Sequence, residues 1–125
     1  MTTAIPSPVL IHGLDDPQRL LAELEFTPLV TDGRVGVEVH HLYTAADTGG
    51  GPAAALVRYH QGAQAAPHRH TGYEIIHVLD GELITDAGTH PAHTMLVMPP
   101  NSVHAPRTDT GALMLVVWEA PVENV

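Results

Sequence analysis

The chain has 125 residues, with 14 acidic and 5 basic side chains, a formal net charge of −9 and no cysteine. This composition excludes disulfide frameworks and zinc–thiolate sites, and it disfavours nucleic acid as a partner because the chain has no basic stripe. The length suits a single domain over residues 1–125 that buries a core of its own.

The chain begins with MTTAIPSPVLIHG, which lacks a basic start followed by an apolar run, and no later stretch has the length of a membrane span. We therefore expect a cytoplasmic protein that does not bind membranes. An amino-terminal arm with one short helix is assigned to residues 1–25. Asp16 can cap this helix, Pro17 suits its first turn, and leucines at helical spacing follow over residues 17–24.

Seven β-strands are expected after the helix, because short apolar and β-branched runs alternate with glycines and prolines. Many short strands of this kind are typical of an all-β sandwich or barrel. The strands are predicted over residues 26–30, 34–43, 54–60, 73–79, 82–85, 94–98 and 113–118. The turns between them are predicted at Thr31–Gly33, Gly49–Pro52, Asp80–Gly81, Asp86–Gly88 and Asp109–Gly111.

One segment carries metal-ligating side chains at strand spacing. His68 and His70 lie two residues apart, Glu74 follows four residues on, and His104 ends a second, turn-rich segment. Residues two apart on a strand share a face, so His68, His70 and, beyond a short turn, Glu74 can converge on one point. Imidazole and carboxylate are donors that divalent transition metals bind. Glu74 can alternatively hold a histidine tautomer, or be replaced as a ligand by another histidine.

The segment from Gly62 to Gly81 resembles the first signature of the cupin family. Its spacing, G-x5-H-x-H-x3-E-x6-G, agrees with that signature residue for residue. By this resemblance the cupin core covers residues 54–119. The resemblance implies an all-β fold, a double-stranded β-helix or jelly-roll barrel, with one divalent metal held inside by His68, His70, Glu74 and His104.

A second cupin signature is matched less fully by the segment Pro99–His104. Asn101 occupies a position where glycine is usual, and asparagine tolerates left-handed backbone almost as well as glycine does. His93 stands where an earlier glycine is common and tolerates that backbone less well, so we expect a different turn there. Thr108 replaces an asparagine that is often varied in the family.

Within the cupins, the chain looks closest to one branch. That branch includes the zinc-binding cupin module of bacterial anti-sigma factors and stand-alone enzymes with a similar domain. The likeness is carried by Pro67–Glu74 and Pro99–Pro106. The segment ahead of the cupin core is too short for the helical domain with which an anti-sigma factor binds its partner. The resemblance therefore implies the fold and the metal site rather than the sensor role.

The metal itself is left open by the sequence. Iron, manganese, nickel, zinc and copper all suit three imidazoles and one carboxylate, whereas calcium and magnesium prefer oxygen ligands. An octahedral ion with four protein ligands keeps positions for water or substrate, so it can polarise an oxygen atom or, as iron, bind dioxygen. Four ligands on zinc can instead complete a closed structural site.

Three further histidines and one arginine are candidate catalytic residues. His40 and His41 are adjacent on a predicted strand, so one of them faces inward and can act as an acid–base group near neutral pH. His60 lies either inside or outside the barrel. Arg58 can bind a substrate carboxylate or phosphate, or form a surface salt bridge instead. His77 is expected to face away from the metal.

The remaining large side chains are expected to pack. Met95, Met98 and Met114 are predicted in the core, and Trp118 at an edge or a dimer contact. An exposed hydrophobic strand over residues 9–11 suits pairing with a second copy, so we expect a homodimer.

Together these features predict a metal-dependent cupin enzyme that acts on an oxygenated small molecule in an apolar cavity. The preferred interpretation, by resemblance to small cupin dioxygenases, is a dioxygenase that cleaves a diketone or hydroxyketone at iron. A redox-neutral cyclase or isomerase, as among polyketide-cyclase cupins that use zinc, is the second. A metal- or ligand-binding regulatory module without turnover is the third, and a fold alone does not decide among them.

Overall fold

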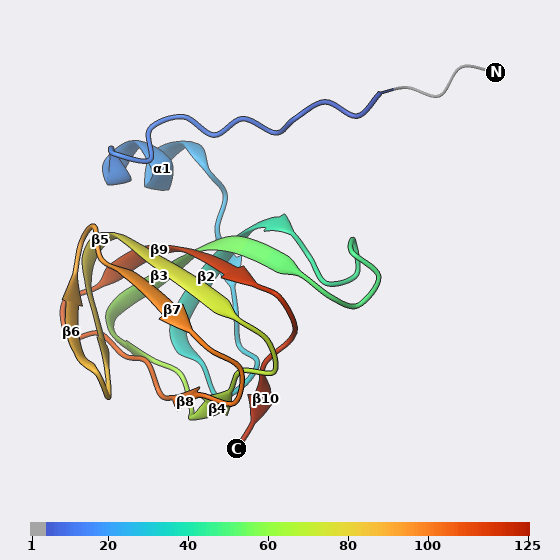
Figure 1. Ribbon diagram of the computed structural model, residues 1–125. Helices are drawn as coiled ribbons and strands as arrows, with labels where there is room; N and C mark the ends of the chain where they lie inside the picture. Colours follow the sequence, from blue (N-terminus) through green and yellow to red (C-terminus); the bar gives the residue numbers. More distant parts are fainter. Residues whose placement is uncertain (1–4) are drawn as a thin grey trace.

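The computed structural model describes residues 5–125 as a β-barrel preceded by one short helix (Figure 1). No helix among these residues is long and apolar enough to cross a membrane. The elements in chain order are α1 (Pro17–Glu23), β1 (Thr27–Pro28), β2 (Val35–Tyr43), β3 (Ala53–Gln64), β4 (His68–Arg69), β5 (Glu74–Thr85), β6 (Gly88–Pro91), β7 (Met95–Met98), β8 (Val103–His104), β9 (Ala112–Trp118) and β10 (Glu123–Asn124).

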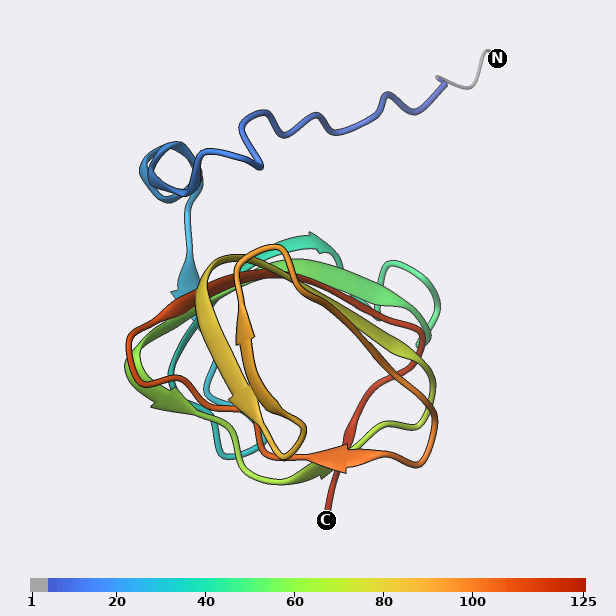
Figure 2. The same cartoon turned by 60° about the vertical axis from the view of Figure 1, so that its left-hand side comes forward.

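Two antiparallel sheets form the barrel. The larger has the strand order β1-β2-β3-β9-β5-β6, with β7 also paired to β5, and the smaller has the order β10-β4-β8. Figure 2 looks into the ring that these strands enclose. The late strand β9 lies between β3 and β5, which is the interleaving of a jelly roll. The predicted all-β double-stranded β-helix is therefore confirmed.

The helix α1 forms where its sequence predicts it. The Asp16 side chain accepts a hydrogen bond from the Arg19 N–H at 3.2 Å, and Pro17 occupies the first turn, where no N–H is needed. The helix ends at Glu23, one residue before the predicted end. Leu20 is buried and anchors the helix on the outer side of the sheet, where it packs with Leu56, Leu79 and Leu113.

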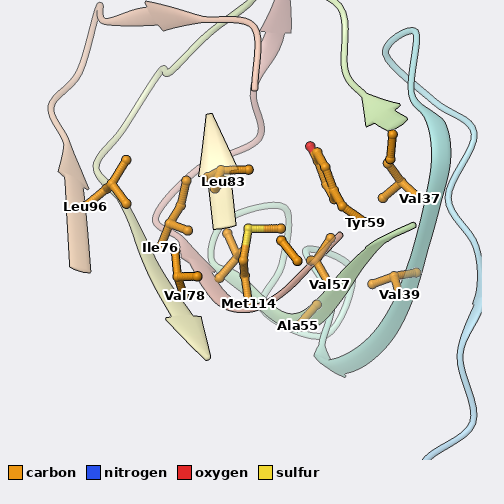
Figure 3. Packing of buried hydrophobic residues seen from close by; sticks show 13 residues of the cluster. Val37, Val39, Ala55, Val57, Tyr59, Ile76, Val78, Leu83, Leu96 and Met114 are labelled. Carbon is orange, nitrogen blue, oxygen red and sulfur yellow. The ribbon is translucent and has the colours of Figure 1, made fainter. Parts of the chain in front are cut away.

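Apolar side chains fill most of the barrel interior (Figure 3). Successive residues of a strand point to opposite faces, so alternate residues enter the core. Each side chain of this size contributes about 1.5–3 kcal/mol when it is fully buried. The interior around any polar group is therefore a low-dielectric one. The inward residues include Val37 and Val39 on β2, Val57 and Tyr59 on β3, Ile76 and Val78 on β5, and Met114 and Val116 on β9.

The predicted turn at Asp80–Gly81 is wrong. Strand β5 runs unbroken through these residues, with a register shift between Val78 and Asp80. Gly81 has a φ of +70°, and a Cβ there would lie 2.0 Å from the carbonyl oxygen of Gly111. The glycine thus marks a β-bulge, because left-handed backbone serves a bulge as well as a turn. The bulge lets one strand pair with β7 before it and with β6 after it.

The two substitutions at usual glycine positions both lie in left-handed backbone. Asn101 has a φ of +72° and His93 a φ of +74°. His93 therefore adopts the left-handed backbone that a glycine would adopt at this position, and the prediction that the turn differs there to avoid it is wrong. The His93 N–H donates a hydrogen bond of 2.7 Å to the Val78 carbonyl, which ties the turn to β5.

Some predicted packing positions differ in the structure. Met114 is buried and Met98 packs against the core, but Met95 is exposed because alternation on β7 places it on the outer face. Trp118 packs against the interior cluster rather than at an edge. Residues 9–11 form no strand and belong to an arm that leads away from the barrel (Figure 1). Val9 and Leu10 are exposed, whereas Ile11 packs against the cluster of Leu20, Leu56, Leu79 and Leu113.

Candidate metal centre

Four polar side chains from two separate stretches of the chain meet inside one end of the barrel. Strand β4 begins with His68 and β8 ends with His104, and the pairing of these strands sets the two residues directly opposite each other. His70 follows β4 and is tied to the loop ahead of β8 by two main-chain hydrogen bonds. Glu74 begins β5. All four residues are buried, which is unusual for polar side chains.

The ring nitrogens of the three histidines converge on one point. One nitrogen from each of His68, His70 and His104 lies within 4.8 Å of the others, and Nε2 of His104 lies 2.9 Å from Nε2 of His68. Two nitrogens bound at right angles to a cation about 2.1 Å away would be about 3 Å apart, which this separation matches. Glu74 approaches the same point, with Oε2 3.3 Å from His70 Nε2 and Oε1 4.0 Å from His104 Nε2.

Hydrogen bonds at Nδ1 of His68 and of His70 leave the Nε2 atoms of these two rings unprotonated. His68 Nδ1 lies 3.2 Å from the Ala66 carbonyl, an acceptor, so this nitrogen carries the proton. His70 Nδ1 lies 2.9 Å from the Ser102 hydroxyl, whose own proton is donated to the Pro99 carbonyl at 2.6 Å. The hydroxyl must therefore accept from His70. Both rings present a lone pair at Nε2, which is the tautomer that a metal requires.

Three buried polar atoms of the cluster have no hydrogen-bond partner among the described residues, namely Nε2 of His70, Oε2 of Glu74 and Nδ1 of His104. The first two lie close together but are poorly aligned for a hydrogen bond. An unpaired buried polar group costs about 1–3 kcal/mol, so native proteins rarely retain one without a function. A cation between these atoms would satisfy both, and the nitrogen and oxygen donors fit a divalent transition metal.

Burial also keeps two of the rings neutral. Burial, together with the nearby His68 and His70, lowers the pKa of His104 to about 3, and burial lowers the pKa of His68. Burial acts in the same direction on His70, but the Glu74 carboxylate outweighs it and raises the pKa of that ring. At neutral pH protons therefore do not compete with a metal for the nitrogens of His68 and His104.

The profile of the ChrR cupin-like domain matches residues 18–123, which is most of the chain. The chain belongs to this family of cupins. The family resemblance found in the sequence is thereby confirmed. No protein with a curated description matches the chain.

Solved cupin structures share the fold at low sequence identity. The acetylacetone dioxygenase of Acinetobacter johnsonii is 13% identical with a TM-score of 0.74, over 100% of this chain and 81% of that one. The polyketide cyclase RemF of Streptomyces resistomycificus is 18% identical with a TM-score of 0.68, over 83% and 81%. The complex of SigE with the anti-sigma ChrR from Rhodobacter sphaeroides matches at 22% identity with a TM-score of 0.63, over 78% of this chain and 50% of that one. These likenesses establish the cupin fold.

The cupin barrel contains a cavity beside the histidine cluster. His68, Glu74 and His104 form part of its wall, Tyr59 adds a hydroxyl group, and the remaining wall is mostly apolar. The cavity is small, with a volume of about 30 Å³. A second, more open hollow of about 200 Å³, the outer hollow, lies next to it. The two share Leu29, Arg34 and Trp118, so these three side chains lie between the cavity and the outer hollow.

The adjacent histidines on β2 face opposite ways, as predicted for neighbours on a strand. His40 points outward, where Nδ1 lies 2.9 Å from the Glu25 carbonyl and the ring packs against Phe26 with centroids 6.0 Å apart. His41 shares the inward face of Val39 and lines the outer hollow. Of this pair, His41 is therefore the one that lies beside the outer hollow.

His60 and Arg58 lie outside the barrel. They alternate on β3 with Val57 and Tyr59, which point inward, so their own side chains face outward. The imidazole of His60 contacts the Glu38 carboxylate, and Arg58 lies 4.0 Å from the same carboxylate. The alternative in which His60 lies inside the barrel is wrong. The surface salt bridge considered for Arg58 is present.

Three residues that shape the site, Tyr59, Arg34 and Ser102, are not among the candidate site residues that the sequence predicts. Tyr59 was expected only to pack, although its place two residues after Val57 on a predicted strand puts it on the inward face. Arg34 is predicted as the first residue of a strand, but it lies in the turn ahead of β2, whose Arg34 N–H donates to the Thr31 carbonyl. Ser102 lies in the loop ahead of β8. Strand alternation therefore gives no inward direction for either residue. Their positions depend on where distant strands bring these turns.

Proposed function

We propose that this cupin is an enzyme that uses one divalent transition metal to act on a small oxygenated molecule. The observation that carries the proposal is a buried set of three imidazoles and one carboxylate that opens into an apolar cavity. A purely structural core would not bury unpaired polar atoms beside empty space, because both cost stability.

The metal ligands in this proposal are His68, His70, Glu74 and His104. A metal bound there would act as a Lewis acid toward a carbonyl, enolate or hydroxyl oxygen, and as iron it would supply oxygen chemistry. The Ala66 carbonyl and the Ser102 hydroxyl hold two of the rings in the required tautomer. The fourth ligand, Glu74, reduces the net charge of the site, so the bound ion would be less costly to bury.

The residues around the cluster suit a small, largely apolar substrate. Val57, Ile76 and Met114 line the cavity and exclude water from the place where the substrate would react. His41 lines the outer hollow beside the cavity, where its ring can accept a proton from the substrate or donate one to it. The reaction we prefer is oxygen-dependent cleavage of a diketone or hydroxyketone, since an acetylacetone dioxygenase has the same fold.

The test combines metal analysis with oxygen uptake. Protein purified without chelator is analysed for metal, stripped, and reloaded separately with Fe²⁺ and with Zn²⁺. We expect about one ion per chain, and oxygen consumption with acetylacetone and related diketones only in the iron-loaded protein. Conversion of a polyketone by the zinc-loaded protein without oxygen uptake would favour the cyclase instead. A fully metal-free protein that cannot be loaded would contradict both.

A regulatory module without turnover is the alternative from another class. It is favoured by the family, whose profile takes its description from ChrR, and by the possibility that four protein ligands close a zinc site. One zinc ion per chain, no reaction with any ketone, and stable association with a sigma factor would support it.

We further propose that two copies of the chain associate through the amino-terminal arm. Val9 and Leu10 are 81% and 72% exposed, and the arm borders a groove that includes Leu42, Leu56 and Leu115. An apolar arm exposed to this degree favours burial against a second copy. Light scattering should give the mass of a dimer for the wild type and of a monomer for the Val9→Asp, Leu10→Asp variant.

A further inference from the structure

Arg34 differs from every other basic residue of this cupin. The chain has five bases, all of them arginines, and the side chains of the other four are 37% to 51% exposed. The Arg34 side chain is 9% exposed. Removing a guanidinium from water is costly unless acceptors replace the lost hydration. The stability of a buried Arg34 therefore depends on which acceptors its guanidinium nitrogens find.

Only one nitrogen of Arg34 is satisfied by the protein. Nη1 donates to the Asp32 carboxylate at 2.9 Å, and to the carbonyl and hydroxyl of Thr31 at 3.2 Å and 3.3 Å. Neither Nε nor Nη2 has an acceptor within residues 5–125. An arginine in which one edge of the guanidinium is fixed and the other is free is suited to bind a planar anionic oxygen group.

Close packing holds the turn that carries Arg34 beside the metal-binding segment. A Cβ on Gly33 would lie 2.5 Å from the Ala66 Cβ, and a Cβ on Gly36 would lie 3.1 Å from the Ala63 Cβ. Both glycines have left-handed backbone, with φ of +64° and +73°. The turn therefore rests directly on the chain that leads into His68. The position of Arg34 relative to the cluster is set by this contact.

Arg34 shares the cavity wall with a second side chain of suitable chemistry, Tyr59. Arg34 and Tyr59 line the same space as His68, Glu74 and His104. Figure 3 shows the Tyr59 ring rising from the packed apolar side chains with its oxygen at the end away from them. No side chain among residues 5–125 forms a hydrogen bond that perturbs this hydroxyl. Burial raises the pKa of Tyr59 to about 12 although nearby Arg34 opposes the shift, so the hydroxyl stays a donor at neutral pH.

We propose that Arg34 and the Tyr59 hydroxyl form a binding site for an anionic oxygen group, so that the cavity selects small molecules with a carboxylate or enolate and an apolar body. This inference rests on the proposed function, because it names the substrate class of the same cavity. The oxygens of the ligand take the free Nε and Nη2 donors of Arg34 and the proton of Tyr59. Its apolar part contacts Leu29, Ile76 and Met114.

The cavity supplies its own reporter for a binding test. Trp118 is the only tryptophan of the chain and lines both the cavity and the outer hollow, so its fluorescence should change when a ligand enters. The zinc-loaded protein is titrated with isovalerate and with isovaleramide, which have nearly the same shape but differ in charge. A parallel titration with acetylacetone tests an enolate in place of a carboxylate.

We expect the wild type to bind isovalerate at least about tenfold more tightly than isovaleramide, the scale of a charge-assisted hydrogen bond. Arg34→Gln should abolish the difference, Arg34→Lys should retain part of it, and Tyr59→Phe should weaken isovalerate by about threefold to tenfold. Arg107→Gln is the matched control, since it removes the same charge from an exposed arginine that pairs with Asp109. It should bind both ligands as the wild type does.

Metal content, measured in every variant, separates this inference from the proposed function. If Arg34→Gln changed neither the preference for acid over amide nor the affinity for acetylacetone, the role of Arg34 would be overturned and the metal proposal would remain intact. A wild type that takes up no metal would overturn the proposed function. The preference for isovalerate in that metal-free protein would still test Arg34. An effect of Arg34→Gln on acetylacetone alone would assign the site to enolates.

Discussion

Two groups of histidines on opposite faces of the same barrel have different surroundings. On the outside, His40 meets the Glu25 carbonyl and His60 meets the Glu38 carboxylate. On the inside, the rings of His70 and His104 each retain a buried nitrogen with no partner among the described residues. The outer rings are satisfied by their neighbours and by water. Nε2 of His70 and Oε2 of Glu74, which face each other at 3.3 Å, are satisfied only if something that is not part of the chain binds them.

This difference teaches that the number of histidines is a poor guide to a metal site. The chain has ten, and a sequence cannot rank them by composition. What distinguishes the inner group is burial together with unmet coordination, and both follow from the face of the strand on which a ring lies. The two faces can be compared directly by changing one matched residue on each.

The largest effect is expected from removing one ring of the inner group. His104→Ala should lower metal affinity by at least about a hundredfold, since loss of an outer partner of a ligand alone costs about tenfold to a hundredfold. His60→Ala, on the outer face, should bind metal as the wild type does. Metal content after dialysis against a weak chelator measures both. Full metal content in His104→Ala would show that the inner group is not the site.

A smaller effect is expected on the free energy of unfolding at alkaline pH, where the buried Tyr59 and the exposed Tyr73 should differ. The pKa of Tyr59 is raised by burial from 10.0 to about 12, so above pH 10 the unfolded chain loses this proton while the folded chain keeps it. Stability should therefore fall as pH rises, by about 2–3 kcal/mol between the two values. Urea unfolding at alkaline pH should show this slope in the wild type and in Tyr73→Phe, whose residue is exposed. Tyr59→Phe should lack it.

The smallest effect concerns the hydrogen bond behind His70. Ser102→Ala removes the hydroxyl that accepts from Nδ1, but the Ser102 carbonyl remains 3.1 Å away and can take its place. Metal affinity should therefore fall by at most about tenfold. Thr85→Ala removes a comparable contact between a hydroxyl and His90, at 2.8 Å in the β5–β6 hairpin, and should leave metal affinity unchanged. Competition titrations with a chromophoric chelator resolve differences of this size. Equal affinities for both variants would show that the hydroxyl does not orient the ring.

Several parts of the fold are predictable because their causes are local. The cap at Asp16 and the proline at Pro17 begin the helix, and alternation along β5 sends Glu74 to the inward face together with Ile76. The continuous course of β5 through Gly81 is not predictable in this way. An Asp–Gly pair favours left-handed backbone, and only the close approach of Gly111 decides that this backbone is a bulge rather than a turn.

The sequence by itself determined the fold class, the family and the close spacing of His68, His70 and Glu74, since strand periodicity and short motifs act over a few residues. Tertiary structure decided the rest. The pairing of β4 with β8 brings His104 to His68. The contact of Gly33 with Ala66 carries Arg34 to the cavity, and the same strand alternation that admits Tyr59 turns Arg58 outward. These outcomes depend on contacts between residues far apart in the chain. No pattern of neighbouring residues in the sequence reports such contacts.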